Sequence, residues 1–121
     1  MLSIRTITNK EIPVIEVKGE LKVGNKTEIE EAVNSVLTPG SRQLILDLTG
    51  ITSLDADETQ AIIEAVHRSL GQGGRLALVI SEKDKENALR EARILDDPGV
   101  MIFPDAKKAF VYLGERGIDM A

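Results

Sequence analysis

The segment from Leu44 to Gln60 constrains this chain most, because it combines a buried strand, a helix start and a group of carboxylates. Leu44 to Leu48 is a short, almost wholly apolar run, which is typical of a strand buried on both faces of a sheet. From Thr59 onward the apolar residues fall at helical spacing, so a helix is predicted to begin near Asp55 to Glu58. Open α/β sheets usually place their sites where such a strand ends. This corner is therefore the first candidate for a functional site.

Composition narrows the class of protein. The chain has 121 residues and 42% hydrophobic content, which suits one domain with one core, so residues 1–121 are predicted to form a single domain. The sequence has no cysteine, which excludes disulfides and favours a cytoplasmic location. A net charge of −5 argues against nucleic-acid binding. No apolar run is long enough for membrane insertion, and the N-terminus lacks the layout of a signal peptide.

Turn residues and periodicity divide the chain into alternating elements. Strands are predicted at Ile4 to Ile7, before a turn at residues 8–10, and at Pro13 to Val17, where Gly19 ends the strand. Their short connection favours an antiparallel hairpin. The later strands are Leu44 to Leu48, Leu76 to Ile80 and Val100 to Phe103, and the helices run from Asn25 or Thr27 to Leu37, Asp57 to Leu70, Lys83 to Leu95 and Asp105 to Gly114. The predicted fold is α/β, with order β-β-α-β-α-β-α-β-α and helices packed mainly on one side of a mixed sheet.

The acidic residues at the predicted start of the second helix have an ordinary structural explanation. Asp55 or Asp57 can cap the free amides of the helix, and a carboxylate there is favoured by the helix dipole. Hard cations also prefer clustered carboxylates. However, the loop lacks convergent ligands from a second strand end apart from Asp47, so no metal is predicted. Asp47 is expected at the strand end, as an acceptor that organises the loop.

Other candidates for chemistry have little support. His67 is the only histidine, and we expect it on the surface of the second helix. Without a second histidine, a cysteine or a serine beside a base, nucleophilic catalysis has no basis. Gly71-Gln-Gly-Gly74 precedes a strand and opens no helix, so it is a helix stop rather than a phosphate loop. Charges of both signs alternate between Lys83 and Arg93, which indicates a solvated helix face. No catalytic residue and no cofactor is predicted.

The element order, with the turn Leu54-Asp-Ala-Asp-Glu58, resembles the STAS domain. That family includes bacterial anti-sigma factor antagonists and the cytoplasmic tails of sulfate transporters. Four segments carry the resemblance over nearly the whole chain: Val17 to Lys22, Leu44 to Asp55, Arg75 to Ile80 and Ile102 to Phe110. They are similar, in that order, to the second strand of the family, its central strand and following loop, its fourth strand, and its closing strand and helix. The resemblance implies a non-catalytic protein-interaction module.

In the antagonist branch the loop reads Asp-Ser-Ser-Gly or Asp-Ser-Thr/Ala-Gly, and a partner kinase phosphorylates the hydroxyl at its third position. By this resemblance Asp55 matches the leading Asp and Ala56 the second position. Asp57 falls on the phosphorylated position, and Glu58 replaces the glycine. The chain therefore lacks a hydroxyl at the usual phosphorylation position.

This substitution changes the charge of the loop permanently. Phosphorylation adds roughly −1.5 to −2 charges at pH 7, whereas Asp57 carries one at all times, so it would be a weak constitutive mimic of the modified state. Lys22 stands where the family usually has an Asp on the neighbouring strand end, and it could pair with Asp57. Such an exposed pair contributes only about 0–1 kcal/mol. Ser53 and Thr59 are the nearest hydroxyls, although Thr59 should lie within the first turn of the helix.

The predicted contact surface is the switch loop with the adjoining strand end: Lys22, Asp55, Ala56, Asp57, Glu58 and Thr59. The implied partner is a protein, either an anti-sigma kinase-like protein or a larger assembly such as a stressosome or a lipid-transport ABC complex.

Two other interpretations stay open. An enzyme, or a small-ligand or metal binder, would use Asp47, Asp55 and Asp57 and would need a concave pocket at that corner with a strongly perturbed carboxylate pKa. A homodimer would leave an exposed apolar patch on the third helix.

Overall fold

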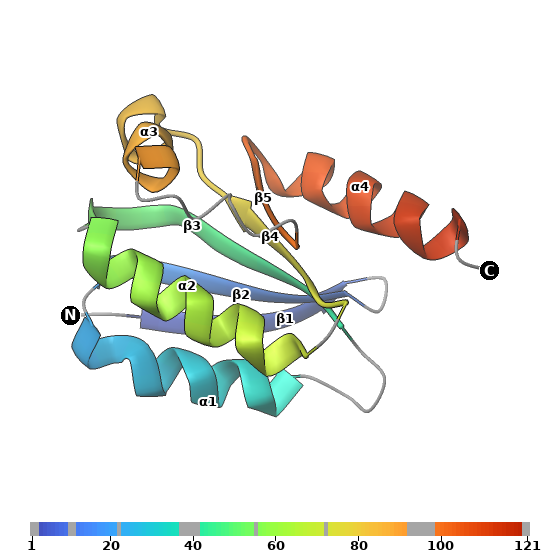
Figure 1. Cartoon of the computed structure of the whole chain (residues 1–121), viewed down its shortest axis with the longest axis horizontal. Helices are drawn as coiled ribbons and strands as arrows, with labels where there is room; N and C mark the ends of the chain where they lie inside the picture. The colour runs from blue at the N-terminus through green and yellow to red at the C-terminus, as the bar shows by residue number, and fades with distance from the viewer. Residues whose placement is uncertain are drawn as a thin grey trace.

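The computed structural model describes residues 3–9, 12–21, 23–36, 42–54, 56–71, 73–91 and 99–119. Within these residues the strands and α-helices follow one another in the predicted order (Figure 1). The strands are β1 (Ser3–Asn9), β2 (Ile12–Leu21), β3 (Gln43–Leu54), β4 (Arg75–Val79) and β5 (Val100–Phe103). The helices are α1 (Lys26–Val36), α2 (Ala56–Leu70), α3 (Lys83–Glu91) and α4 (Ala106–Asp119), with the short 3-10 helix η1 (Val23–Asn25) before α1.

The five strands form one mixed sheet with the order β1-β2-β3-β4-β5. β1 and β2 pair antiparallel, from Ser3↔Lys18 to Asn9↔Ile12, which confirms the predicted hairpin. The pairs β2–β3, β3–β4 and β4–β5 are parallel. Parallel neighbours need a crossover connection, and α1, α2 and α3 lie in these connections. The predicted fold class is confirmed.

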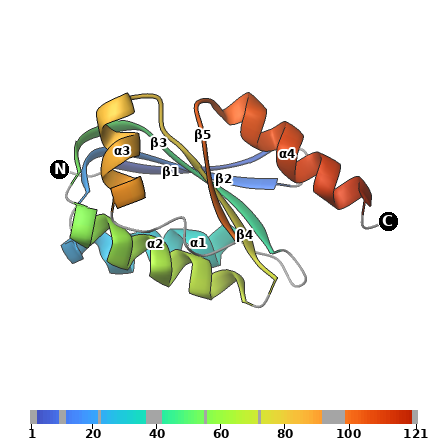
Figure 2. The same ribbon diagram turned by 45° about the horizontal axis from the view of Figure 1, so that its top comes forward.

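Helices cover both faces of the sheet. Figure 2 shows α1 and α2 below it and α4 above it. Leu44 and Leu46 of β3 lie in the apolar cluster on the α1 and α2 face, and Leu89 of α3 joins this cluster. Ile45 lies in a second cluster with Ala109 of α4. Among the described helices, three therefore contribute to one side and α4 covers the other. β3 is buried on both faces, as its apolar sequence predicted.

β3 is longer than predicted. The sequence indicated a strand from Leu44 to Leu48, but β3 continues to Leu54 because this segment keeps pairing with β2, as far as Leu21↔Leu54. Its pairing with β4 ends earlier, at Asp47↔Val79. The part of β3 after Asp47 therefore has a strand neighbour on one side only. Asp47, predicted at the strand end, lies in the strand interior.

Gly19 does not end β2, contrary to prediction, because the strand runs on to Leu21. Two register shifts between β2 and β3 lie close to this glycine, between Glu16 and Lys18 and between Gly19 and Glu20. At each shift β3 advances one residue further than β2, as in a β-bulge. Gly19 has φ of 106°, which a residue with a Cβ rarely adopts. Glycine here permits an irregular strand rather than a break.

Two boundaries near the N-terminus also differ from the sequence prediction. β1 extends through Asn9, so residues expected in a turn still pair with β2. α1 begins at Lys26, so of the two predicted caps Asn25 precedes the helix and Thr27 lies inside it. The Asn25 Nδ2 donates to Glu28 Oε1 at 3.2 Å.

The second half of the chain follows the prediction closely. α2 and β4 begin within one residue of their expected positions, and β5 coincides with its predicted range. α4 continues past its predicted end to Asp119 and includes Gly114 and Gly117, since isolated glycines inside a helical pattern are tolerated. Leu37 and residues 92–98, which include the predicted end of the third helix, lie outside the described residues. No helix in the described ranges is long and apolar enough to cross a membrane.

Replacing Gly19 with alanine should lower the free energy of unfolding by about 1–3 kcal/mol, because φ of 106° strains an L residue. Gly24→Ala is the matched control, since an added Cβ there meets nothing within 4 Å. It should leave stability unchanged or raise it by up to about 1 kcal/mol. Urea unfolding of both variants measures the difference. Equal stabilities would contradict the assignment of strain to Gly19.

Candidate functional site

The C-terminal ends of β2 and β3 lie side by side. Leu21↔Leu54 is the last pair in their register, and α2 begins at Ala56. The chain therefore enters α2 directly from a corner of the sheet. Lys22 and Asp55 follow this last pair in sequence, and both lie outside the described residues.

The other residues of the predicted contact surface open α2. Its first four residues are Ala56, Asp57, Glu58 and Thr59, which agrees with the helix start expected from the sequence. The Asp57 side chain is exposed to solvent. A carboxylate in the first turn of a helix is stabilised by the positive end of the helix dipole. Asp57 thus presents a negative charge at the corner where β3 passes into α2.

Thr59 differs from Asp57 because its side chain is fully buried. Among the described residues it is the one buried polar side chain, and its Oγ1 has no hydrogen-bond partner. A buried hydroxyl without a partner costs about 1–3 kcal/mol. A kinase cannot reach this hydroxyl unless the first turn of α2 opens. Ser53, the other nearby hydroxyl residue, lies in β3 opposite Glu20.

Asp47 organises its own strand. Its Oδ1 accepts hydrogen bonds from the Thr49 backbone N–H at 2.9 Å and the Thr49 hydroxyl at 2.7 Å. This is the acceptor role that the sequence predicted, in the interior of β3 instead of at its end. Asp47 precedes the last residue of β3 by seven positions, which is roughly 20 Å of extended strand. The structure therefore does not bring Asp47 together with Asp57.

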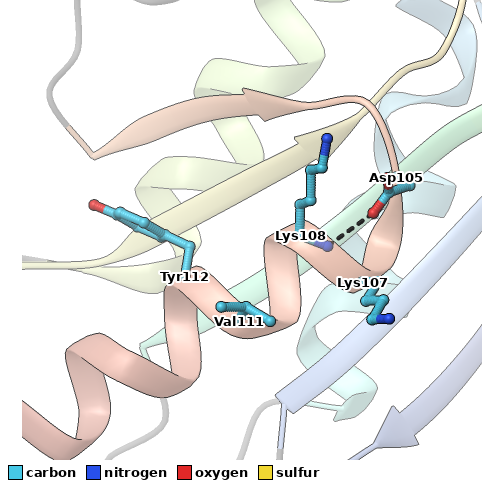
Figure 3. A pocket seen from close by; sticks show the side chains of 5 residues that line it. All are labelled: Asp105, Lys107, Lys108, Val111 and Tyr112. Carbon is cyan, nitrogen blue, oxygen red and sulfur yellow. Dashed lines mark hydrogen bonds between the residues drawn. The ribbon is translucent and has the colours of Figure 1, made fainter.

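A shallow hollow of about 380 Å³ lies on α4, away from this corner (Figure 3). Its lining residues are Asp105, Lys107, Lys108, Val111 and Tyr112. Asp105 Oδ1 accepts the Lys108 backbone N–H at 2.8 Å and caps the helix. The Tyr112 ring centroid lies 5.4 Å from that of Phe103. Because α4 covers the sheet face opposite α1 and α2, this hollow does not supply the pocket that the ligand-binding interpretation requires. Within the described residues, no three His, Cys, Asp or Glu side chains gather as a metal site.

The charged residues of α3 include a solvent-facing group and one inward lysine. Glu86 pairs with Arg90 at 2.9 Å and with Lys83 at 3.8 Å, as expected for a solvated face of mixed sign. The hydrogen bond from Arg90, aided by the charge of Lys83 and opposed by partial desolvation, lowers the pKa of Glu86. Lys85 departs from the prediction. Its side chain is only 16% exposed, and its Nζ donates to the backbone oxygen of Ile51 in β3.

His67 has a structural contact that the sequence did not predict. Its Nε2 lies 3.1 Å from the backbone oxygen of Gly74, within hydrogen-bond distance. A Cβ added at Gly99 would come within 2.5 Å of the same nitrogen, so the ring packs closely against this residue. His67 is thus half-buried and ties α2 to the segments that lead into β4 and β5. Gly71, with φ of 78°, follows α2 as the predicted helix stop.

The apolar patch predicted for a homodimer is not found on the described part of α3. Leu89 of that helix is buried, and the large hydrophobic side chain exposed among the described residues is Val111 of α4. One exposed aliphatic residue is ordinary for a protein surface. It is therefore no evidence for association.

The chain belongs to the STAS domain family, whose model matches residues 3–109. This range runs from β1 into α4 and includes the corner between β3 and α2. The resemblance drawn from the sequence is thereby confirmed. A comparison with curated proteins found no match.

Solved structures share this fold at low sequence identity. An anti-sigma factor antagonist from Mycobacterium paratuberculosis is 17% identical, with 93% of each chain covered and a TM-score of 0.77. The Bacillus cell fate determinant SpoIIAA in its phosphorylated form is 16% identical, with 92% of this chain and 99% of that chain covered and a TM-score of 0.63. The anti-sigma factor antagonist SpoIIAA in its unphosphorylated form is 14% identical, with 93% and 98% covered and a TM-score of 0.65. These likenesses establish the fold.

Replacing Thr59 with valine should raise the free energy of unfolding by about 1 kcal/mol, because a methyl group takes the place of a buried hydroxyl without a partner. Thr59→Ser is the matched control. It keeps the hydroxyl and removes a buried methyl group, so it should lower stability by about 1 kcal/mol. Urea unfolding measures both. A valine variant less stable than the wild type would mean that the hydroxyl is hydrogen-bonded in solution.

Proposed function

We propose that this chain is a non-catalytic protein-interaction module, with residues 1–121 as one domain, that binds a protein partner at the corner between β3 and α2. The observation that carries the proposal is the pairing Leu21↔Leu54 beside an exposed Asp57 in the first turn of α2. Two strand ends and a helix start thereby lie close together within the range that matches the STAS family. The proposed contacts are Lys22 and residues 55–58, and the buried Thr59 supports the first turn of α2 from inside.

The partner that this surface fits is an anti-sigma kinase-like protein or a subunit of a larger regulatory or transport assembly. Support comes from the family itself and from solved structures of the same fold that are named as anti-sigma factor antagonists. The acidic Asp57 at the helix start favours a basic contact on the partner, because opposite charges across an interface speed association and fix its orientation.

The module works without the usual phosphorylation switch. Asp57 takes the position that carries the hydroxyl in the antagonist branch, and a carboxylate cannot accept a phosphate in the same way as serine or threonine. Its single permanent charge is smaller than the roughly −1.5 to −2 of a phosphate. The loop is therefore held permanently close to the phosphorylated state, which other family members reach only when a kinase modifies them.

Reversing the charge of Asp57 should weaken partner binding by about tenfold or more, because like charges then face each other across the contact. The partner is first identified by affinity capture from the source cells and mass spectrometry, then purified and titrated by calorimetry against wild type and Asp57→Lys. Lys107→Glu is the matched control, since it reverses one exposed charge on α4 at the opposite face of the sheet. Thermal unfolding checks that both variants fold. If Asp57→Lys binds as tightly as the control, the corner is not the contact surface.

Replacing Asp57 with serine should make this position a substrate for phosphorylation. With the captured kinase and ATP, Asp57→Ser should take up phosphate at the introduced hydroxyl, and the wild type should take up none. Phosphopeptide mass spectrometry distinguishes the positions. Phosphate on Ser53 or Thr59 of the wild type would contradict the proposal, because the switch would then use another hydroxyl. Recovery of transport subunits with neither form modified would place the module in an assembly that uses no phosphorylation.

A further inference from the structure

The C-terminal part of β3 lacks a strand on one side. β4 pairs with β3 only from Gln43↔Arg75 to Asp47↔Val79, whereas β2 follows β3 to Leu54 through two register shifts. Residues 48–54 therefore have β2 as their only strand neighbour in the described sheet. An edge of this kind leaves backbone carbonyls that need another partner when they are shielded from water.

α3 lies beside this unsupported segment. Figures 1 and 2 both draw α3 near the end of β3 that leads into α2. Leu89 of α3 and Ile51 of β3 belong to the same apolar cluster and are 0% and 2% exposed. The helix thus covers the segment where β4 has already ended. Both side chains are therefore buried in one apolar cluster, although they lie far apart in the sequence.

Lys85 supplies a polar partner to this segment. Its Nζ donates to the backbone oxygen of Ile51 and also to Glu82 Oε1 at 3.0 Å. Only 16% of the Lys85 side chain is exposed, whereas the Lys83 side chain is 77% exposed. A lysine usually extends its charged end into water. Lys85 instead directs its ammonium group to a β3 carbonyl, and a hydrogen bond from a charged donor is stronger than one between neutral groups.

We propose that Lys85 is a positioning residue that holds the C-terminal end of β3, and hence the start of α2, against α3. Ile51 precedes Leu54 by three residues, and the first turn of α2 begins at Ala56. A carbonyl fixed at Ile51 therefore restricts the path of the chain into the corner where Asp57 is presented. That this corner contacts a partner rests on the proposed function, but the positioning by Lys85 does not.

Hydrogen–deuterium exchange on the full free chain tests this role. Lys85→Met keeps most of the apolar stem and removes the donor, so exchange in peptides covering residues 49–58 should rise about tenfold, as expected for the loss of one charged hydrogen bond to a locally opening segment. Lys85→Arg retains a charged donor and should stay close to the wild type. Lys83→Met is the matched control and should leave residues 49–58 unchanged. Peptides from β5 and α4 should exchange as in the wild type in all three variants.

The result separates positioning from general stabilisation. If exchange in Lys85→Met rises equally in all peptides, the lysine only stabilises the whole fold. If exchange in residues 49–58 does not rise, the lysine does not hold this segment. Either outcome overturns the proposal. The same holds if Lys83→Met loosens this segment equally. No partner is needed for the experiment, so its failure is distinguishable from an Asp57→Lys variant that binds normally.

Discussion

The burial of β3 on both of its faces is the constraint on which the rest of the structure depends. Its side chains alternate between the apolar cluster under α1 and α2, which holds Leu44 and Leu46, and the cluster under α4, which holds Ile45. β3 also pairs with β2 on one side and β4 on the other. Where a strand has neighbours on both sides and is covered on both faces, it is largely apolar, as Leu44, Ile45 and Leu46 are. Parallel strands need crossover connections, and α1, α2 and α3 lie in those connections.

The candidate site arises because β3 extends seven residues beyond its last pair with β4, from Asp47 to Leu54. The extra residues of β3 stay in the sheet through β2, and the left-handed backbone of Gly19 lets the two strands pass through a change of register. α3 is tied to this part of β3 by the hydrogen bond from Lys85 to Ile51, and Leu89 of α3 lies in the same apolar cluster as Ile51. The chain consequently reaches α2 at an outer corner of the sheet. Support from two sides restricts the position of the first turn of α2, and such preorganisation would reduce the entropy lost on binding the proposed partner.

The exposed acidic side chain at this corner supports the proposed role in partner recognition. Asp57 is exposed, Thr59 is buried without a hydrogen bond, and Asp47 is engaged by Thr49 some distance along the strand. The hollow on α4 lies on the opposite face of the sheet. An exposed negative charge at the start of a helix can be recognised by a partner with a complementary, positively charged surface.

Local sequence patterns by themselves determined the order of the elements, the hairpin, the double-sided burial of β3 and the start of α2, because periodicity, turn chemistry and helix capping act over a few residues. Only the tertiary structure decided where β3 ends, that Gly19 lies within a strand, that the Thr59 hydroxyl is buried and that Lys85 turns inward. Lys85 lies four residues before Leu89, on the buried side of α3. This spacing indicated an inward lysine, but the alternating charges around it favoured a solvent-exposed face. Its partner Ile51 is 34 residues away. Contacts between such distant segments depend on packing that a local pattern cannot encode.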